Sequence, residues 1–229
     1  MSSHTRSLQN SDRVAVVGGG PAGSFFAIQF LREARRLGRN IEVVIVEKRG
    51  PTDPSSDDIQ CRGCNFCAGL ISPRLNKILE KHGLVVPEAI IQGRIDYVWI
   101  QGEWKNFRLR VPKDMQMYSV FRGSLPGRRA GRPAGFDGFL LGEAVKEGAR
   151  ILYGEVQALA YAPSGMPTLT LRTPAGEKVS LDADFVTMAT GINARCGLDY
   201  QIGIEVGANP LAYCFVGKRH GAALKSLSF

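Results

Sequence analysis

"RVAVVGGGPAGSFFAIQFLREARRLGRNIEVVIVEKR" occupies residues 13–49 and carries the strongest structural pattern in the chain. Two short apolar runs rich in β-branched residues, 14–17 and 41–46, predict buried parallel strands. A stretch with helical apolar spacing lies between them and begins at a glycine-rich turn. The region therefore predicts a strand, a helix and a second strand in that order.

The turn has the spacing G-x-G-x-x-G, and each of its glycines has a separate role. Gly18 permits the tight turn, Gly20 lets a pyrophosphate approach the backbone, and Gly23 lets the helix pack on the strand. The helix N-terminus offers free N–H groups and a positive dipole end to phosphates. Glu47 ends the second strand, where a carboxylate accepts hydrogen bonds from a ribose diol and disfavours the 2′-phosphate of NADP.

These residues also carry a family resemblance. The segments VVGGGPAGS and VVIVEKR resemble the FAD-binding start of the two-dinucleotide-binding-domain flavoproteins, which include geranylgeranyl reductases and aromatic-ring monooxygenases. Pro21-Ala22 and Glu47-Lys48 are typical of the FAD users in that superfamily. The resemblance therefore implies that these four residues contact FAD together with the three glycines.

A second part of the chain resembles the same superfamily. The segment DFVTMATG is similar to its second FAD-binding signature, whose small residues meet the dinucleotide; here they are Ala189, Thr190 and Gly191. Short strands within 151–185 predict the antiparallel meander that the superfamily inserts, and Val156 matches a position whose main chain meets adenine. The expected fold class is α/β, a Rossmann-like FAD-binding domain with a parallel sheet and an inserted antiparallel β-meander.

Two helices are expected in the middle of the chain. Ser72 and Pro73 are typical of a helix start, and Leu75, Ile78 and Leu79 give that helix an apolar face. A later helix, FDGFLLGEAVKEGARI, resembles the R-x-x-F-D-x-x-L segment of geranylgeranyl-reductase-like flavoproteins. Arg132 is the implied cofactor contact, although it stands one residue further from the Phe-Asp pair than that pattern has it.

The region 95–120 predicts an antiparallel hairpin. Its apolar and aromatic residues alternate on either side of a turn near Gly102, as in Tyr97 and Trp99 and then Phe107 and Leu109. This aromatic stripe is compatible with a lipid pocket, but we interpret it as core.

The segment CRGCNFCAGLIS, residues 61–72, is open to four interpretations. Cys61, Cys64 and Cys67 could hold an iron–sulfur cluster or zinc, with the missing fourth ligand supplied by Cys196 or Cys214. A thiolate near a helix N-terminus could instead perform redox chemistry, or the cysteines could pack as small apolar residues. We favour a resemblance to the C-G-G-G-hydrophobic-S segment of geranylgeranyl-reductase-like proteins, which implies that Cys67, Ala68 and Gly69 lie beside the flavin. Cys67 is then the candidate catalytic residue.

Charge and hydropathy limit the partners. The net charge of +8 suits an anionic partner such as a phosphate-rich cofactor or a lipid headgroup. We expect no nucleic-acid binding, because the basic stretch 122–132 lacks an aromatic platform or a helix–turn–helix pattern. No apolar run approaches the roughly 18 residues of a transmembrane span. We expect a cytoplasmic protein that could make peripheral contact with a membrane surface.

The chain is expected to divide into a flexible tail (1–12), an FAD-binding domain (13–195) and an incomplete segment (196–229). The third superfamily signature, a Gly-Asp pair, is absent after residue 191, and so is most of a substrate domain. We therefore expect a truncated product, a fragment or a subunit completed by a partner, which alone binds FAD weakly. The resemblance implies an FAD-dependent oxidoreductase that reduces C=C bonds of an isoprenoid lipid, with NAD(P)H as electron donor. The alternatives are an aromatic monooxygenase and a catalytically incomplete FAD-binding subunit.

Overall fold

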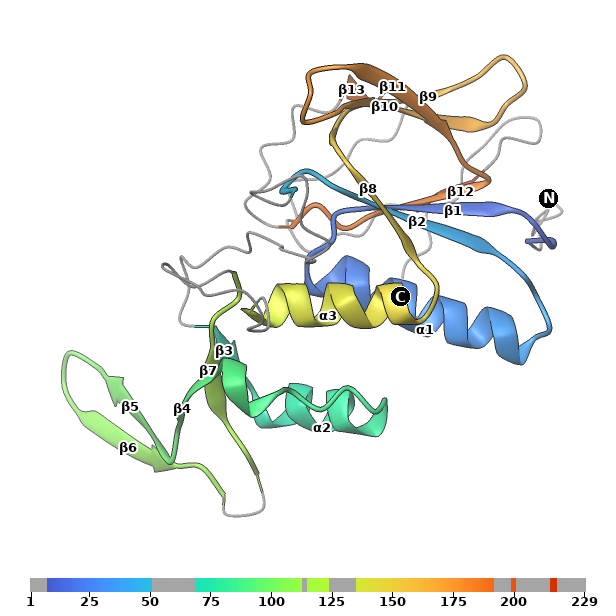
Figure 1. Cartoon of the computed structure of the whole chain (residues 1–229). Coiled ribbons are helices and arrows are strands. Elements are labelled where there is room, and N and C mark those ends of the chain that lie inside the picture. The colour runs from blue at the N-terminus through green and yellow to red at the C-terminus, as the bar shows by residue number, and fades with distance from the viewer. Residues whose placement is uncertain are drawn as a thin grey trace, which may run out of the picture.

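The computed structural model describes residues 8–50, 69–112, 115–123, 135–191, 199–200 and 215–217. Within these residues the main body has three layers (Figure 1). A mostly parallel sheet lies in the middle, two helices cover one of its faces, and an antiparallel sheet covers the other. The predicted α/β fold with an inserted antiparallel meander is confirmed.

The central sheet has the order β14-β12-β1-β2-β8 among the described strands. These are β1 (Arg13–Val17), β2 (Glu42–Glu47), β8 (Arg150–Tyr153), β12 (Phe185–Met188) and β14 (Phe215–Gly217). All neighbours pair in parallel except β14, which pairs with β12 in the antiparallel direction. The apolar runs of β1 and β2 are almost fully buried because both faces of this sheet are covered.

Helices α1 (Pro21–Arg36) and α3 (Gly135–Lys146) pack side by side on one face of the central sheet. Small residues at the contact, such as Ala27 and Ala144, are fully buried. At the solvent edge Arg32 and Arg35 of α1 both donate hydrogen bonds to the carboxylate of Glu147, just after α3. These hydrogen bonds link the helix that begins at the glycine-rich turn to the residue after α3.

The antiparallel sheet covers the opposite face. Its order is β11-β10-β9-β13, with β9 (Glu155–Tyr161), β10 (Pro167–Arg172), β11 (Lys178–Asp182) and β13 (Asp199–Tyr200). Leu159, Leu169 and Leu171 are fully buried against the central sheet. The meander starts at residue 155 rather than at 151, because residues 150–153 pair with β2 instead.

A smaller lobe contains β3 (Leu70–Ile71), α2 (Pro73–Lys81), a 3-10 turn (Glu88–Ile90), β4 (Ile91–Arg94) and β7 (Tyr118–Val120). Ser72 caps α2 as predicted, because its hydroxyl accepts a hydrogen bond from the N–H of Leu75. The predicted apolar face of this helix is wrong in part. Leu75 and Ile78 are 37% and 38% exposed, and the buried residues are Leu79 and Asn76. Asn76 is buried because it accepts a hydrogen bond from the hydroxyl of Tyr118.

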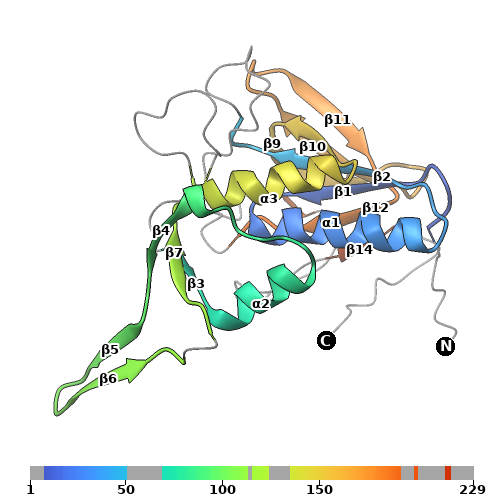
Figure 2. The same ribbon diagram turned by 60° about the horizontal axis from the view of Figure 1, so that its bottom comes forward.

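The predicted hairpin is formed by β5 (Tyr97–Gln101) and β6 (Asn106–Arg110), and it projects away from the rest of the molecule (Figures 1 and 2). The interpretation of its aromatic stripe as core is wrong. Trp99 is 63% exposed and Phe107 54% exposed, because no other described element lies over either face.

The described residues near both ends of the chain make contact with the main body. Residues 8–12 are tied to the turn before β2, since the N–H of Ser11 donates to the carbonyl of Asn40. Beyond residue 195, β13 and β14 add strands to the two sheets, which no sequence pattern indicated. Among the described residues no helix is long and apolar enough to cross a bilayer.

Candidate functional site

The carboxyl ends of β1, β2 and β12 meet at one edge of the central sheet. The N–H of Gly18 donates to the carbonyl of Val46, and the N–H of Ala189 donates to the carbonyl of Val17. The strand order reverses at this place, because β2 lies on one side of β1 and β12 on the other. Ligands of open α/β sheets bind at such a switch point.

The glycine-rich turn is crowded on its inner side. Gly18 has a φ of +108°, and a Cβ there would lie 2.4 Å from the carbonyl oxygen of Ala189. A Cβ on Gly23 would lie 1.9 Å from the carbonyl oxygen of Gly18 and 3.1 Å from the side chain of Val16. Gly18 therefore brings the two signature segments together, and Gly23 lets α1 pack on β1 as the sequence predicted.

The outer side of the same turn is open. A Cβ on Gly20 would meet nothing within 4 Å. Gly20 is the N-cap of α1 without a side-chain cap, Pro21 follows it, and the first turn holds no acidic residue. Among the described residues, no side chain accepts a hydrogen bond from the first N–H groups of α1, including that of the exposed Ala22. An uncapped helix N-terminus behind an open glycine fits the phosphates of a dinucleotide.

Glu47 lies directly over the turn. Its buried carboxylate, 6% exposed, accepts hydrogen bonds from the N–H of Gly19 at 2.6 Å and of Arg49 at 2.8 Å. A Cβ on Gly19 would lie 3.1 Å from the same carboxylate oxygen. Sequence reasoning missed Gly19, because the motif counts it as a variable position. A carboxylate has about four acceptor positions, so Glu47 keeps acceptor capacity for ribose hydroxyls.

The other expected cofactor residues surround this edge. Thr190 and Gly191 follow β12 and are exposed, and Gly191 has a φ of +83° with open space beside it. Lys48 is exposed after β2. The N–H of Gly154 donates to the carbonyl of Glu47, which places the start of β9, with Val156, next to the end of β2. The structure thus brings these residues together, and their contacts with a cofactor remain predictions.

The Phe-Asp segment at the start of α3 has a partner that the sequence did not indicate. Arg122 donates two hydrogen bonds to the carboxylate of Asp137, at 3.0 and 2.9 Å. Asp137 is almost fully buried, and burial raises the pKa of its carboxyl although Arg122 lowers it. Arg49 and Glu47 also act on this pKa, so the pair belongs to the electrostatic surroundings of the glycine-rich turn.

The chain between Arg122 and Asp137 explains why this pair was missed. The N–H of Phe136 donates to the carbonyl of Phe121, so the start of α3 follows directly on the end of β7 in space. A Cβ on Gly135 would lie 2.4 Å from the carbonyl oxygen of Gly123. Residues 124–134 separate these two ends along the chain. Arg132, the cofactor contact that the family resemblance implied, lies outside the described residues.

All five cysteines lie outside the described residues, and so does Ala68. Gly69 is described, and it has a φ of +59°. A Cβ there would lie 1.9 Å from the carbonyl oxygen of Val120, and the N–H of Val120 donates to the carbonyl of Gly69. The contact with β7 therefore requires glycine at this position, and proximity to a flavin remains a prediction.

Two further observations concern other kinds of site. The described residues contain no group of three or more His, Cys, Asp or Glu side chains arranged to hold a metal ion. A hollow of about 430 Å³ lies at the base of the β5–β6 hairpin, lined in part by Arg94, Asp96 and Arg110. Its lining residues are separate from the glycine-rich turn, so the nucleotide argument does not rest on this hollow.

No protein-family model and no curated protein match the sequence. Solved structures do match. A flavoprotein/dehydrogenase from Cytophaga hutchinsonii is 20% identical with a TM-score of 0.54, and 80% of this chain covers 40% of it. The myxobacterial FAD-dependent halogenase CndH is 16% identical with a TM-score of 0.56, and 81% of this chain covers 38% of it. The flavin-dependent brominase Bmp2 is 18% identical with a TM-score of 0.55, and 80% of this chain covers 38% of it.

The chain has the Rossmann-like fold of these flavoproteins. It spans about 40% of the length of the first of them. At these identities the similarity concerns the fold, and the chemistry has to be argued from the site.

Proposed function

We propose that this chain is the FAD-binding part of a flavin-dependent oxidoreductase. The observation that carries the proposal is the turn 18–23, which is closed on its inner side by Ala189 and open outward at Gly20 in front of an uncapped helix N-terminus. The flavoproteins with the same fold support the choice of FAD over other dinucleotides. Bound flavin would supply the electron-transfer chemistry, and the protein would orient it.

The described residues suggest how the cofactor would be held. Gly20 and the first N–H groups of α1 would face the pyrophosphate, and Glu47 would accept hydrogen bonds from the ribose diol. Val156 would meet adenine through its main chain. The small residues that follow β12 would lie along the dinucleotide, with Lys48 at the rim of the site.

The reaction that we propose first is the reduction of C=C bonds in an isoprenoid lipid. The alkene would gain a hydride from reduced flavin and a proton from solvent or an acid, and NAD(P)H would reduce the flavin again. The support is the similarity of residues 67–72 and of Phe136-Asp137 to segments of geranylgeranyl-reductase-like proteins. Cys67 is the candidate side chain beside the flavin.

A second candidate is an oxygen-dependent flavoenzyme that halogenates or hydroxylates an aromatic substrate. It is supported by two proteins of similar fold, an FAD-dependent halogenase and a flavin-dependent brominase. A third candidate is a subunit that binds FAD and needs further polypeptide for turnover. The short span of this chain relative to the structures it matches supports that possibility.

Cofactor binding is tested by titrating the purified chain with FAD in a calorimeter, with FMN and NADP as competitors. We expect FAD to bind more tightly than both, because FMN lacks the adenosine half and NADP carries a 2′-phosphate beside Glu47. Equal binding of FMN would contradict the dinucleotide site. Tight, stoichiometric flavin in the purified chain would contradict the weak binding that we expect of this chain alone.

A second experiment distinguishes the two reactions. It uses the same protein together with any further polypeptide that it needs for turnover. Chemically reduced FAD is supplied without oxygen together with an isoprenoid diphosphate, and saturation is followed by mass spectrometry. A parallel sample receives oxygen, a halide and a phenolic substrate. Product only in the oxygen-containing sample would replace the reductase proposal with the halogenase or monooxygenase.

A further inference from the structure

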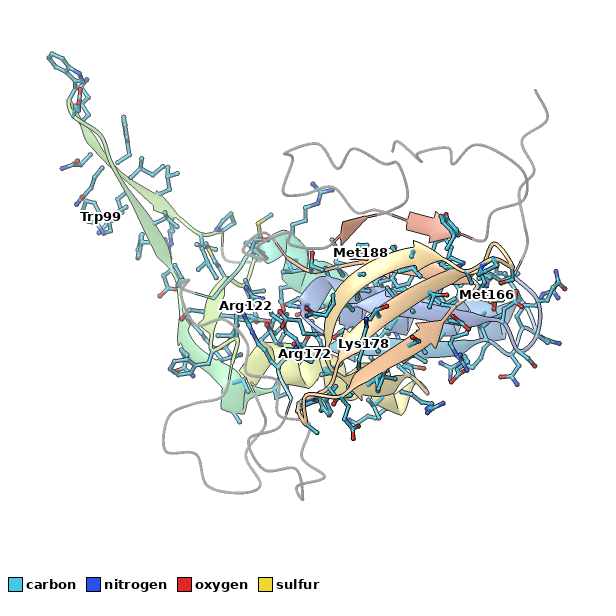
Figure 3. All side chains as sticks on the ribbon, turned by 90° about the horizontal axis from the view of Figure 1, so that it is seen from above. Trp99, Arg122, Met166, Arg172, Lys178 and Met188 are labelled. Carbon is cyan, nitrogen blue, oxygen red and sulfur yellow. The ribbon has the colours of Figure 1, made fainter. Side chains whose placement is uncertain are left out.

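The β5–β6 hairpin stands apart from the other sheets of the described structure. It is a sheet of two strands that pairs with no other described strand, and it points away from the body in all three views (Figures 1, 2 and 3). A hairpin of two strands is marginally stable alone in water. We therefore expect a binding partner to cover its exposed surface.

The two faces of the hairpin follow from its register, in which Trp99 lies opposite Arg108 and Ile100 opposite Phe107. One face is purely apolar and consists of Val98, Ile100, Phe107 and Leu109. Ile100 and Phe107 are 47% and 54% exposed. A face of an antiparallel sheet that meets only water normally carries polar residues. This face of the hairpin carries none.

The other face combines aromatic rings with cations. The guanidinium of Arg108 lies 4.5 Å from the ring centre of Tyr97 and 5.8 Å from that of Trp99. Arg110 lies 5.9 Å from the ring centre of Tyr97. These stacked arginines carry positive charge at the level of the rings while their apolar stems stay on the sheet.

The tip of the hairpin also combines an aromatic ring with a cation. Trp104 is 93% exposed in the turn, next to Lys105. Tryptophan and tyrosine rings are favoured at the boundary between lipid and water because they are apolar with one polar end. The hairpin thus places aromatic rings at its tip and on one face, with arginines beside them.

We propose that the β5–β6 hairpin docks this protein on an anionic lipid bilayer. The tip and the apolar face would enter the headgroup region, and Lys105, Arg108 and Arg110 would pair with lipid phosphates. Charge complementarity favours lipid over a second copy of the chain. The hairpin carries these three cations against one carboxylate, Glu103, so two hairpins facing each other would repel.

The chain provides its own probe for this proposal. Its only two tryptophans, Trp99 and Trp104, both lie in the hairpin, so tryptophan emission reports on this element alone. The full chain is mixed with vesicles of phosphatidylcholine or of phosphatidylcholine and phosphatidylglycerol, without flavin. We expect sedimentation with the anionic vesicles only, a blue shift of the emission, and weaker binding at high salt.

Two charge-reversal variants locate the contact. Arg108→Glu with Arg110→Glu should weaken partitioning by roughly 25-fold or more, because each cation near an anionic surface contributes about fivefold. The matched control is Arg172→Glu with Lys178→Glu, which reverses a directly opposed pair of cations in the β10–β11 hairpin of the body (Figure 3). This control should stay within about threefold of the wild type, since its charges lie away from the contact.

Four outcomes would overturn the proposal. The first is wild-type protein that does not bind the anionic vesicles, and the second is an equal loss of binding in both variants. The third is a concentration-dependent blue shift without vesicles, which would mean that a second copy covers the hairpin. Quenching of the wild-type tryptophans by bromine-labelled lipids needs no variant, and its absence would also overturn the proposal. None of these measurements depends on the proposed reaction.

Discussion

The carboxylate of Glu47 accepts a hydrogen bond of 2.6 Å from the backbone N–H of Gly19. The last side chain of β2 thus holds the turn that follows β1 without any ligand. A second hydrogen bond from Arg49 fixes the other carboxylate oxygen. A site whose parts are already fixed loses less conformational entropy when a dinucleotide binds.

Replacing Glu47 by glutamine tests this arrangement. A glutamine offers only one acceptor oxygen, so either Gly19 or Arg49 loses its acceptor and meets an amide NH₂ group instead. We expect the free energy of unfolding to fall by about 1–3 kcal/mol, because a buried N–H is left unpaired. Urea denaturation measures this change, with the exposed Glu177→Gln as control. FAD affinity should fall in the Glu47 variant and stay unchanged in the control.

Gly20→Ala separates binding from folding. The position has ordinary extended backbone and open space beside it, so the chain alone should keep its stability within about 0.5 kcal/mol. The new methyl group would occupy the side of the turn proposed for the pyrophosphate. We expect FAD affinity in calorimetry to fall by at least about tenfold. Unchanged affinity would show that the pyrophosphate does not lie there.

Gly23→Ala should instead destabilise the fold, even without FAD. Its Cβ would lie 1.9 Å from the carbonyl oxygen of Gly18, so α1 would have to move away from β1. We expect a loss of about 3 kcal/mol or more in the free energy of unfolding, measured by denaturation without FAD. A variant as stable as Gly20→Ala would mean that the helix–strand contact is looser than the structure has it.

Thr187 carries an unsatisfied polar group in the core. Its hydroxyl is buried in β12 and has no hydrogen-bond partner in the described structure. Thr187→Val replaces the hydroxyl by a methyl group of similar size, so we expect the free energy of unfolding to rise by about 1 kcal/mol. Thermal denaturation measures the change, and Thr168→Val is the control because its hydroxyl is paired with Asp182. A destabilised Thr187 variant would indicate a partner for this hydroxyl.

The sequence was sufficient to predict the unit formed by β1, α1 and β2. It was insufficient to predict the contacts that other segments make around that unit. The positions of β1, α1 and β2 follow from apolar periodicity and from glycines whose steric reason is local, such as Gly23. The pairing of Arg122 with Asp137 could not be read in the same way. Residues 124–134 stand between the two along the chain. Backbone hydrogen bonds from Phe136 to Phe121 and from Asp137 to Arg122 bring them together in space, beside the close contact of Gly135 with Gly123.

The hairpin and α2 show that sequence periodicity alone does not predict which residues are buried. Alternation of apolar residues predicted an antiparallel hairpin within residues 95–120, but alternation does not say whether anything covers its strands. In α2 the periodicity favoured Leu75 and Ile78, yet a hydrogen bond from Tyr118 turns Asn76 inward. Burial is decided by the neighbouring elements, which the pattern of one segment does not contain.

The ion pair of Arg122 with Asp137 gives the last prediction, a dependence on pH. Burial raises the pKa of the Asp137 carboxyl, and Arg122 opposes that rise. In Arg122→Met the folded-state pKa should therefore rise further. A carboxyl whose pKa is higher in the folded state binds a proton there more readily, so the free energy of unfolding falls as the pH increases through that range.

At neutral pH the variant should be less stable than the wild type by about 3 kcal/mol, because a buried carboxylate loses its partner. The deficit should shrink as the pH falls toward the unfolded pKa of aspartate, about 3.9, since Asp137 is then protonated in both variants. Melting temperatures measured across this pH range test the sign. Arg94→Met is the control, because its ion pair with Glu88 is exposed and should contribute less than about 1 kcal/mol. A deficit that is constant with pH would mean that Arg122 stabilises the start of α3 by packing rather than by charge.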